Sequence, residues 1–485
     1  MQDPKPHNHF STCPSCKGQG KKRQRLRKRV KLTYERDLEQ YKNGVTGVKP
    51  VKPRGHLSIC KNCQGSGLIT VLKPIQPDVD HYPHLAIVGG GIGGVALAVA
   101  CLHRGIPFTL FERDSSFNER SQGYGLTLQQ ASKAMEGFGI TELKEGIVST
   151  KHIVHKTNGT IIGEWGIRKW LQDKENNYDK RTNIHIARQS LRLALLDQLP
   201  SHNVVQWGHK FIDYKAVQDN ELELRFEVNG IIKTTTTNLL IGADGIRSKV
   251  RKLIINEDST PLRYLDCMVI LGICPYHKLD PLKHDLLDSA TVFQTANGHE
   301  RIYMMPYNQE SVMWQLSFPM LEEDAKKLSA LGPKALKEEA CRRTQWHDPI
   351  PQIMAGTTAA HITGYPVYDR ALLNQELLKP HERITLLGDA AHPMSPFKGQ
   401  GANQALLDAL SLARSITKAN NPHNDWRKNG LRSSILNPYE NEMIKRSGVK
   451  VKASAQAAEF LHTDIVLHEA NEPRGRVLKR ENEGL

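Results

Sequence analysis

Glycines and a carboxylate between positions 89 and 113 have the spacing of a turn that binds a dinucleotide. Gly89, Gly91 and Gly94 form the pattern G-x-G-x-x-G, and Glu112 follows 18 positions after the last glycine. In such a pattern the first glycine permits a tight turn, the second lets a pyrophosphate approach the backbone, and the third lets a helix pack on a sheet. Glu112 can accept hydrogen bonds from a ribose, and we count Arg113 beside it as a cofactor-binding candidate. This arrangement alone does not separate NAD from FAD.

Two later motifs favour a flavin. Each is an apolar strand that ends in an acid, with Asp244 in the stretch 239–251 and Asp389 in the stretch 383–393. A carboxylate placed like that of Asp389 suits hydrogen bonds to a polyol chain such as the ribityl of FAD. The glycine turn 399–401 then begins a predicted helix, whose free N–H groups and positive dipole end would stabilise negative charge on a reduced flavin ring.

Four cysteines near the N-terminus have the spacing of a metal site. Cys13 and Cys16, and again Cys60 and Cys63, lie in the repeated pattern C-x-x-C-x-G-x-G. Two such turns can surround one ion with four thiolates, which suits structural zinc and leaves no open position for catalysis. The repeat resembles part of the cysteine-rich zinc domain of DnaJ-type chaperones, over about 20 residues. Unmetallated thiol turns or a redox disulfide pair remain as alternatives.

Specific elements must position these groups. The stretches 84–88 and 108–111 predict two strands, with a helix over 95–104 between them. Later helices are predicted over about 404–418 and 439–460. The 18-residue uncharged run at 85–102 is long enough to raise the question of a membrane span, but the glycine turn explains it better.

Three motifs together resemble the FAD-dependent (group A) aromatic monooxygenases with the p-hydroxybenzoate hydroxylase fold. They are Gly89–Gly94, 242–245 and 388–389, and the resemblance spans about residues 81–465. The stretch 396–403 looks closest to the tetracycline-inactivating and kynurenine-type branches. The resemblance implies an α/β fold, in which a Rossmann-like FAD-binding domain is interleaved with a β-sheet substrate domain.

The same resemblance implies an activity. NADPH or NADH would reduce FAD, and the reduced flavin would react with O2. The resulting C4a-hydroperoxide would hydroxylate an electron-rich aromatic, polycyclic or enolic small molecule, so that the cofactor does the chemistry and no side chain is predicted as catalytic. Two alternatives remain open. One is a flavin-dependent reductase or dehydrogenase of the same fold, and the other is a zinc-dependent protein that binds nucleic acid or a partner and has a regulatory flavin body.

Individual residues also receive roles from the resemblance. Arg120 would lie near the flavin where NAD(P)H docks, and Thr127 would contact the flavin. Arg188 would bind FAD from the start of its own helix, and Asp244 would contact the cofactor near the pyrophosphate. The isoalloxazine ring would be bound by the turn and helix start that contain Gly399, Gly401, Ala402 and Asn403.

The substrate is expected between the flavin and a β-sheet. Residues 261–368 alternate apolar and polar side chains in the manner of strands, which matches the family's substrate-binding sheet. The candidate substrate contacts are Gln294, Met305 and Trp314 from this sheet, with Pro396 and Phe397 from the flavin side.

Charge is distributed unevenly along the chain. The 485 residues carry a net charge of +15, and residues 1–80 alone hold 17 Lys or Arg against 6 Asp or Glu. A predicted basic helix over 21–42 could pack its apolar stripe on the protein itself, bind phosphate backbone, or dock on a partner or an anionic membrane. We therefore expect a zinc-binding head and linker (1–80), a first FAD-binding part (81–260), a substrate domain (261–375) and a second FAD-binding part (376–485). No secretory signal is evident, which predicts a cytoplasmic protein.

Overall fold

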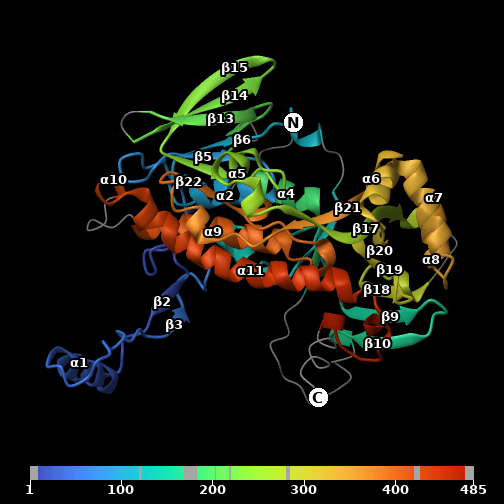
Figure 1. Ribbon diagram of the computed structural model, residues 1–485, viewed down its shortest axis with the longest axis horizontal. Helices are drawn as coiled ribbons and strands as arrows, with labels where there is room; N and C mark the ends of the chain where they lie inside the picture. Colours follow the sequence, from blue (N-terminus) through green and yellow to red (C-terminus); the bar gives the residue numbers. More distant parts are fainter. Residues whose placement is uncertain are drawn as a thin grey trace.

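The computed structural model describes residues 9–119, 123–168, 183–201, 204–217, 220–279, 284–419 and 426–475. These residues form a mixed α/β body with a small N-terminal head on one side (Figure 1). The predicted fold class is therefore confirmed. Arg120 lies outside the described residues.

A five-stranded parallel sheet forms the centre of the body. Its strand order is β12-β6-β5-β16-β22. Three of its strands are short, almost entirely buried apolar runs, as expected of a parallel sheet covered on both faces. The strands are β5 (Leu85–Val88), β6 (Phe108–Phe111), β12 (Val205–Gln206), β16 (Leu239–Gly242) and β22 (Ile384–Leu386).

Long helices pack in the same hydrophobic core as this sheet. Helix α2 (Ile92–Leu102) packs against α9 (Gly401–Ala419), and α9 packs against α11 (Asn437–Phe460). Helix α4 (Arg188–Leu196) contacts α2 as well. Among the helices in the described part of the chain, none combines the length and apolarity needed to cross a membrane.

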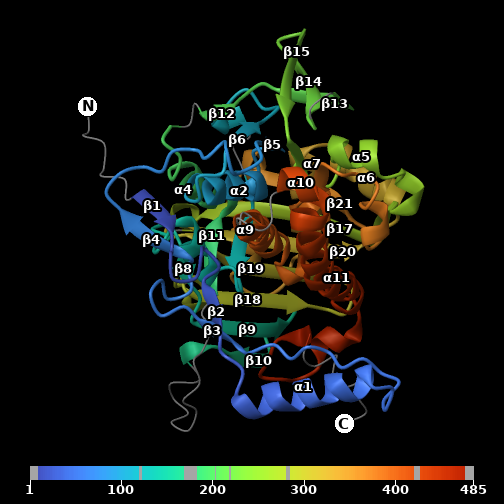
Figure 2. The same cartoon turned by 90° about the vertical axis from the view of Figure 1, so that its left-hand side faces the viewer.

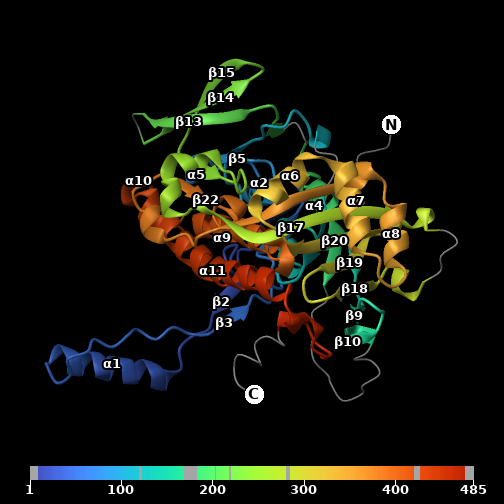
Figure 3. The same cartoon turned by 45° about the vertical axis from the view of Figure 1, so that its right-hand side comes forward.

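A seven-stranded mixed sheet forms the second layer, with the order β10-β9-β18-β19-β20-β17-β21. Helices α6 (Glu322–Ala330), α7 (Pro333–Arg343) and α8 (Ile350–Gly356) flank it on one side (Figure 3). Its strands are β9 (Lys151–Lys156), β10 (Ile161–Trp165), β17 (Leu262–Pro275), β18 (Thr291–Ala296), β19 (Arg301–Asn308), β20 (Ser311–Pro319) and β21 (Ile362–Arg370). Two of these strands thus come from the range 81–260, so the chain passes between the two layers several times.

Two small antiparallel sheets complete the body. One has the order β7-β11-β8 and contacts β19 of the large sheet. The other, β13-β14-β15, projects from the body on the side away from β9 and β10 (Figures 1 and 2). The strands are β7 (Gly125–Leu128), β8 (Ile147–Val148), β11 (Ile184–Ala187), β13 (Lys210–Ala216), β14 (Leu222–Val228) and β15 (Ile231–Thr237).

The head consists of two ribbons and a projecting helix. Strands β1 (His9–Thr12) and β4 (Leu68–Val71) pair next to the body. Strands β2 (Lys21–Arg23) and β3 (Leu57–Ile59) form a stalk that leads to α1 (Lys28–Lys42), which extends away from the body (Figures 1 and 3).

The predicted helix over 21–42 was wrong in its first turns. Lys21–Arg23 pair with Leu57–Ile59, and the pairing is extended at both ends by backbone hydrogen bonds, from Cys60 N–H to Gly20 O and from Gln24 N–H to His56 O. Tertiary pairing across the two cysteine turns therefore overrides the local helical pattern. The later predictions, for the helices near 95–104, 404–418 and 439–460, are confirmed within a few residues.

Candidate active site

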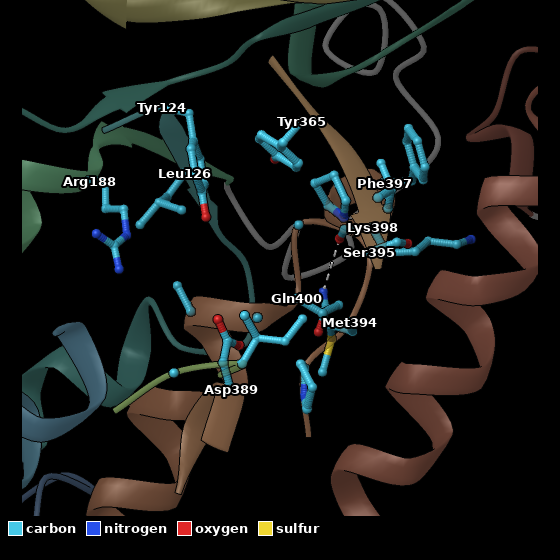
Figure 4. A pocket seen from close by; sticks show the side chains of 18 of the residues that line it. Tyr124, Leu126, Arg188, Tyr365, Asp389, Met394, Ser395, Phe397, Lys398 and Gln400 are labelled. Atoms are coloured by element: carbon cyan, nitrogen blue, oxygen red, sulfur yellow. Dashed lines mark hydrogen bonds between the residues drawn. The ribbon is translucent and has the colours of Figure 1, made fainter. Parts of the chain in front are cut away.

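A cavity of about 760 Å³ lies between the two layers of the body. The start of α2, the strand β7 and the start of α9 form one side of it, and β19, β20 and β21 form the other. Figure 4 shows side chains from these separate segments pointing into one space. Of the predicted site residues, the cavity is lined by Gly91, Thr127, Arg188, Met305, Asp389, Pro396, Phe397, Gly399, Gly401 and Ala402.

The glycine turn requires glycine for two different reasons. A Cβ on Gly89 (φ +114°) would lie 2.4 Å from Ala243 O, and one on Gly94 would lie 1.9 Å from Gly89 O. These two positions allow close approach of backbone segments. At Gly91 a Cβ would meet only Arg188 Nη2, at 4.0 Å, so this glycine leaves open space at the N-terminus of α2. The turn therefore has a free helix N-terminus, which suits the binding of a phosphate group.

Two side chains of opposite charge reach into the cavity with free polar ends. Arg188 stands at the start of α4 and Asp389 lies just after β22, and neither side chain has a hydrogen-bond or ion-pair partner among the described residues. Burial by the surrounding walls raises the pKa of Asp389, while His392 and Arg188 oppose this rise. Asp389 is exposed within this space and Arg188 is half-buried, so a hydrogen-bond acceptor and a cation face the same cavity and suit the polar groups of a ligand.

A buried network holds the turn that carries Asp389. Asp408 on α9 accepts hydrogen bonds from the Gly388 N–H at 2.9 Å and from His392 Nε2 at 2.6 Å. Its second oxygen accepts one from Arg446 Nη2 at 2.7 Å. Burial alone would raise the pKa of Asp408, but His392 and Arg446 outweigh burial and lower it. Asp408 thus fixes the position of the 388–392 turn.

Asn403 lies behind the cavity wall, whereas Gly401 and Ala402 at the start of α9 line the cavity. Its side chain is fully buried and accepts hydrogen bonds from the N–H groups of Gln129 and Ala131, at 2.9 and 3.2 Å. It also donates to Thr127 O and Gly399 O, both at 2.8 Å. The amide therefore ties β7 to the glycine turn and does not line the cavity. The N-terminus of α9 faces the cavity through Gly401 and Ala402.

Three other predicted cofactor contacts lie outside the cavity lining. The Glu112 carboxylate accepts hydrogen bonds from the N–H groups of Gly90 and Asp114, at 2.7 and 3.1 Å. Arg113 is largely exposed beside Asp114. Asp244 Oδ2 accepts hydrogen bonds from the N–H of Lys249 at 2.6 Å and from the next N–H, so it caps the helix α5 (Lys249–Ile254). These groups organise the backbone turns around the cavity.

The face of the large sheet that borders the cavity follows strand alternation. Met305 lies on this face, and its cross-strand partner Met313 lies there too. Trp314, one residue further, points to the opposite face, where its indole N–H donates to Thr357 Oγ1 at 2.9 Å. Gln294 lies opposite Tyr303 on the cavity-side face but does not itself line the cavity, and its side chain accepts a hydrogen bond from Arg301 Nε at 2.8 Å.

The wall that the large sheet contributes to the cavity also contains residues that were not predicted from the sequence. Arg301 is only 5% exposed, and among the described residues its side chain makes one hydrogen bond, to Gln294, and no ion pair. Burial lowers the pKa of Arg301 to about 10, although Tyr303 and Cys267 favour its charge. The other wall residues that the sequence reasoning missed are Tyr124, Tyr303, Met313, Gln315 and Tyr365. The alternation that contains Met305 would have indicated Arg301 and Tyr303, four and two residues before it.

Phe397 closes one end of the cavity. Its ring meets the ring of His462 edge to face, with centroids 5.5 Å apart. His462 is held by Ala458 O at 2.6 Å and by Ser317 Oγ at 2.9 Å, and burial lowers its pKa to about 4. Phe397 is therefore supported from behind by a neutral, fixed side chain.

The four predicted metal ligands meet in the head. The Sγ atoms of Cys13, Cys16, Cys60 and Cys63 all lie within 4.8 Å of one another, and we call them the cysteine cluster. The Cys13–Cys60 and Cys16–Cys63 sulfur distances are 4.0 and 3.7 Å. A tetrahedral site with metal–sulfur bonds of about 2.3 Å has sulfur–sulfur edges of about 3.8 Å. The N–H groups of Gly20 and Gly67 donate to Cys16 Sγ and Cys63 Sγ, at 3.2 and 3.3 Å.

Comparison with known proteins agrees with this geometry. Residues 83–442 match the model of a family described as "FAD binding domain". The chain is 29% identical over 333 residues to aurachin C monooxygenase/isomerase of Stigmatella aurantiaca, which covers 68% of this chain and 80% of that protein.

Solved structures share the fold. The 2,6-dihydroxypyridine-3-hydroxylase of Arthrobacter nicotinovorans matches with a TM-score of 0.64 at 18% identity, over 83% of this chain and 95% of that one. The tetracycline destructase Tet(51) matches with a TM-score of 0.56 at 18% identity, over 84% and 96% of the two chains. The chain therefore belongs to the FAD-binding-domain family and is an FAD-dependent monooxygenase.

Proposed function

We propose that this enzyme uses NAD(P)H and O2 to hydroxylate a small, electron-rich aromatic or enolic substrate that carries a negative charge. One observation supports this most strongly. One cavity has groups suited to FAD on one wall and, on the facing wall, the guanidinium of Arg301, which has no acidic partner among the described residues. In such a reaction one oxygen atom enters the substrate and the other leaves as water, with two electrons supplied by NAD(P)H.

The residues present fit FAD. Gly91 leaves room for the pyrophosphate at the start of α2, and the free ends of Arg188 and Asp389 offer a cation and a hydrogen-bond acceptor. The start of α9 at Gly401 directs unpaired N–H groups and a positive dipole end into the cavity. When bound, FAD would supply hydride acceptance and oxygen activation. Phe397 and the tyrosines of the walls would exclude water from the reacting groups.

Arg301 would select and orient the substrate. A guanidinium recognises a carboxylate or an enolate by paired N–H groups, and its low exposure strengthens the attraction. Gln294 fixes the Nε edge, which leaves the outer N–H groups for the ligand. A solved neighbour, the hydroxylase of 2,6-dihydroxypyridine, acts on an electron-rich ring, which agrees with this substrate class.

Purified enzyme tests the proposal. We expect a yellow protein that absorbs at about 450 nm and consumes NADPH or NADH faster when anionic phenols or enols are added. Under 18O2, the product should contain one labelled oxygen atom per NAD(P)H consumed. Consumption that yields only hydrogen peroxide, with every such compound, would favour the reductase alternative. A colourless protein that does not take up FAD would contradict the flavin assignment itself.

We propose, in addition, that the cysteine cluster binds one Zn²⁺. Four sulfur donors, edges close to those of a tetrahedron and two N–H···S hydrogen bonds support a closed structural site. Elemental analysis should find one zinc per chain. Replacement of Cys60 and Cys63 by serine should remove it.

The projecting arm, residues 21–59, supports a further role in binding nucleic-acid phosphate. It carries 13 Lys or Arg against 3 Asp or Glu, and α1 contains no buried residue. Such a surface gains affinity by releasing counterions, so binding to a labelled DNA or RNA duplex should fall steeply with salt. A triple charge reversal at Arg25, Arg27 and Arg29 should abolish binding and leave NAD(P)H oxidation unchanged. Absence of binding at low salt would exclude this role.

A further inference from the structure

The head is attached to the flavin-binding body by contacts that both cysteine turns make with α9. Gln19, in the first turn, donates from Nε2 to Arg414 O at 2.9 Å. Arg414 Nη2 in turn donates to Ser66 O at 3.1 Å, in the second turn. Thr417, one turn further along α9, lies beside Gly18. One arginine of the body thus bridges the two halves of the metal site.

Near this contact Arg104 is buried and Arg414 is half-buried, and neither has an acid to balance it among the described residues. Arg104, just after α2, is 3% exposed, and only its Nη1 is bonded, to Ala100 O at 2.9 Å. Its Nε and Nη2, and Nε of Arg414, are buried and have no acceptor among the described residues. No carboxylate forms an ion pair with either arginine in that part of the chain. Burial lowers the pKa of Arg104 to about 9.

Arg414 lies against both cysteine turns. Its Nη2 is bonded to Ser66 O and lies 3.2 Å from the place that a Cβ on Gly20 would take, and the Gly20 N–H donates to Cys16 Sγ. Negative charge on Cys16 and Cys63 favours the charged form of Arg414, and negative charge on Cys101, Tyr82 and then Cys16 favours that of Arg104. Four neutral thiols would leave the buried Arg104 and the half-buried Arg414 without a compensating charge, which is unfavourable. Four thiolates around one divalent ion carry a net charge of −2, which matches two arginines.

We propose that Arg104 and Arg414 are the counter-charges of a metal tetrathiolate at the cysteine cluster, so that the bound ion fastens the head to the body. This inference rests on the proposed zinc site. The same helices, α2 and α9, begin at the cavity, where Gly91 and Gly401 face the expected cofactor. The metal therefore holds the far ends of the two helices whose near ends bind FAD.

The test uses the full-length enzyme with its FAD and three measurements. These are zinc content, the rate of zinc transfer to a chromogenic chelator, and amide hydrogen exchange in the head and in residues 410–419. Arg414→Gln and Arg104→Gln should each release zinc about tenfold faster or more, as expected for groups that support metal ligands. Arg414→Lys, which keeps the charge, should recover most of the difference.

Lys418→Gln is the matched control, because it removes one positive charge from an exposed position of the same helix. It should release zinc at the wild-type rate. Zinc removal from the wild-type enzyme should increase exchange in the head and in residues 410–419 together. If Arg104→Gln does not fold, the half-buried Arg414 carries the test alone.

Two failures can be told apart. A wild-type enzyme that contains no zinc, and takes up none when zinc is added, overturns both the zinc site and this inference. A fully loaded enzyme whose arginine variants release zinc at the wild-type rate overturns the counter-charge inference alone. The same holds if zinc removal leaves exchange in residues 410–419 unchanged.

Discussion

The head and the body of this protein are held together in different ways. Around the cysteine cluster the buried apolar material consists of the four cysteines and one partly buried neighbour, Ile69. The body instead encloses a continuous apolar core that joins the parallel sheet to α2, α9 and α11. A core as small as that of the head offsets little of the entropy of ordering its chain, so we expect the head to depend on the metal ion proposed for the cysteine cluster. The body depends on burial.

The two regions also use positive charge differently. The arm exposes 13 basic residues over 39 positions, with few acids between them. In the body, Arg301 and Arg188 both line the cavity, and neither has an acidic partner among the described residues. Many exposed cations give salt-sensitive attraction to polyanions, whereas one buried cation selects a single group on a small ligand.

The largest expected effect separates the two regions. The double variant Cys60→Ser/Cys63→Ser should lose its metal and most hydrogen-exchange protection in the head, because the two short strand pairs and the small apolar core are too weak to order it without the metal. The main thermal transition of the body should fall by only about 3 °C or less. Cys341→Ser, a half-exposed cysteine of the body, is the matched control and should change neither. A head that stays protected without metal would remove the distinction between the two regions.

A second change tests the body in the same way. Asp408→Asn removes a buried charge that pairs with His392 and Arg446, and it should lower the free energy of unfolding by about 3–5 kcal/mol. Denaturant unfolding of the metal-loaded enzyme measures this. Glu442→Gln removes the exposed partner of the same Arg446 and should cost at most about 1 kcal/mol. If both substitutions lowered the free energy of unfolding equally, burial would not determine how much each ion pair stabilises the body.

A third change tests the use of charge. Arg301→Gln should raise KM for an anionic substrate about 10- to 100-fold, since one buried partner of the charged group is lost. FAD affinity should stay unchanged, because Arg301 lies on the wall that faces the cofactor site. Arg342→Gln, at an exposed ion pair of α7, should alter neither. An equal rise in KM for a neutral substrate would show that Arg301 acts on the fold of the pocket and not on charge.

The smallest effect appears as a pH dependence. Because His392 and Arg446 hold the pKa of Asp408 below its usual value, the stability from this carboxylate is fully present above its unfolded pKa, about 3.9. It is lost as pH falls through the lower folded value. The difference in unfolding free energy between wild type and Asp408→Asn should therefore narrow only below about pH 4, by up to ~1.4 kcal/mol per pH unit. A difference that narrows already between pH 8 and pH 5 would contradict this assignment.

The local sequence was sufficient to predict a helix, strand or turn when the residues that it packs or pairs with lie close to it along the chain. The turn at Gly89, Gly91 and Gly94 was predicted with both strands and the helix that flank it. By contrast, the strand at Lys21–Arg23 was mistaken for the first turns of a helix over 21–42, because the strand that pairs with it lies more than 30 residues away.

The side-chain directions in the large sheet show the same limit. Met305 and Trp314 are both apolar residues in predicted strands, yet only Met305 lines the cavity. Strand alternation fixes relative directions within a strand, but which face meets the cavity is decided by the helices that cover the other face. The role of Arg301 depends on that same choice.

By itself, the sequence determined the types of chemistry that this protein can perform. Glycine at a close backbone approach, a carboxylate after a strand and paired cysteines each require a residue type at a fixed spacing, and such requirements are local. Only the tertiary structure decided which charges remain without a partner. Arg104, Arg301 and Arg414 look like ordinary arginines in the sequence. Their proposed roles arise because the fold buries the first two, half-buries the third, and gives none of them an ion-pair partner among the described residues.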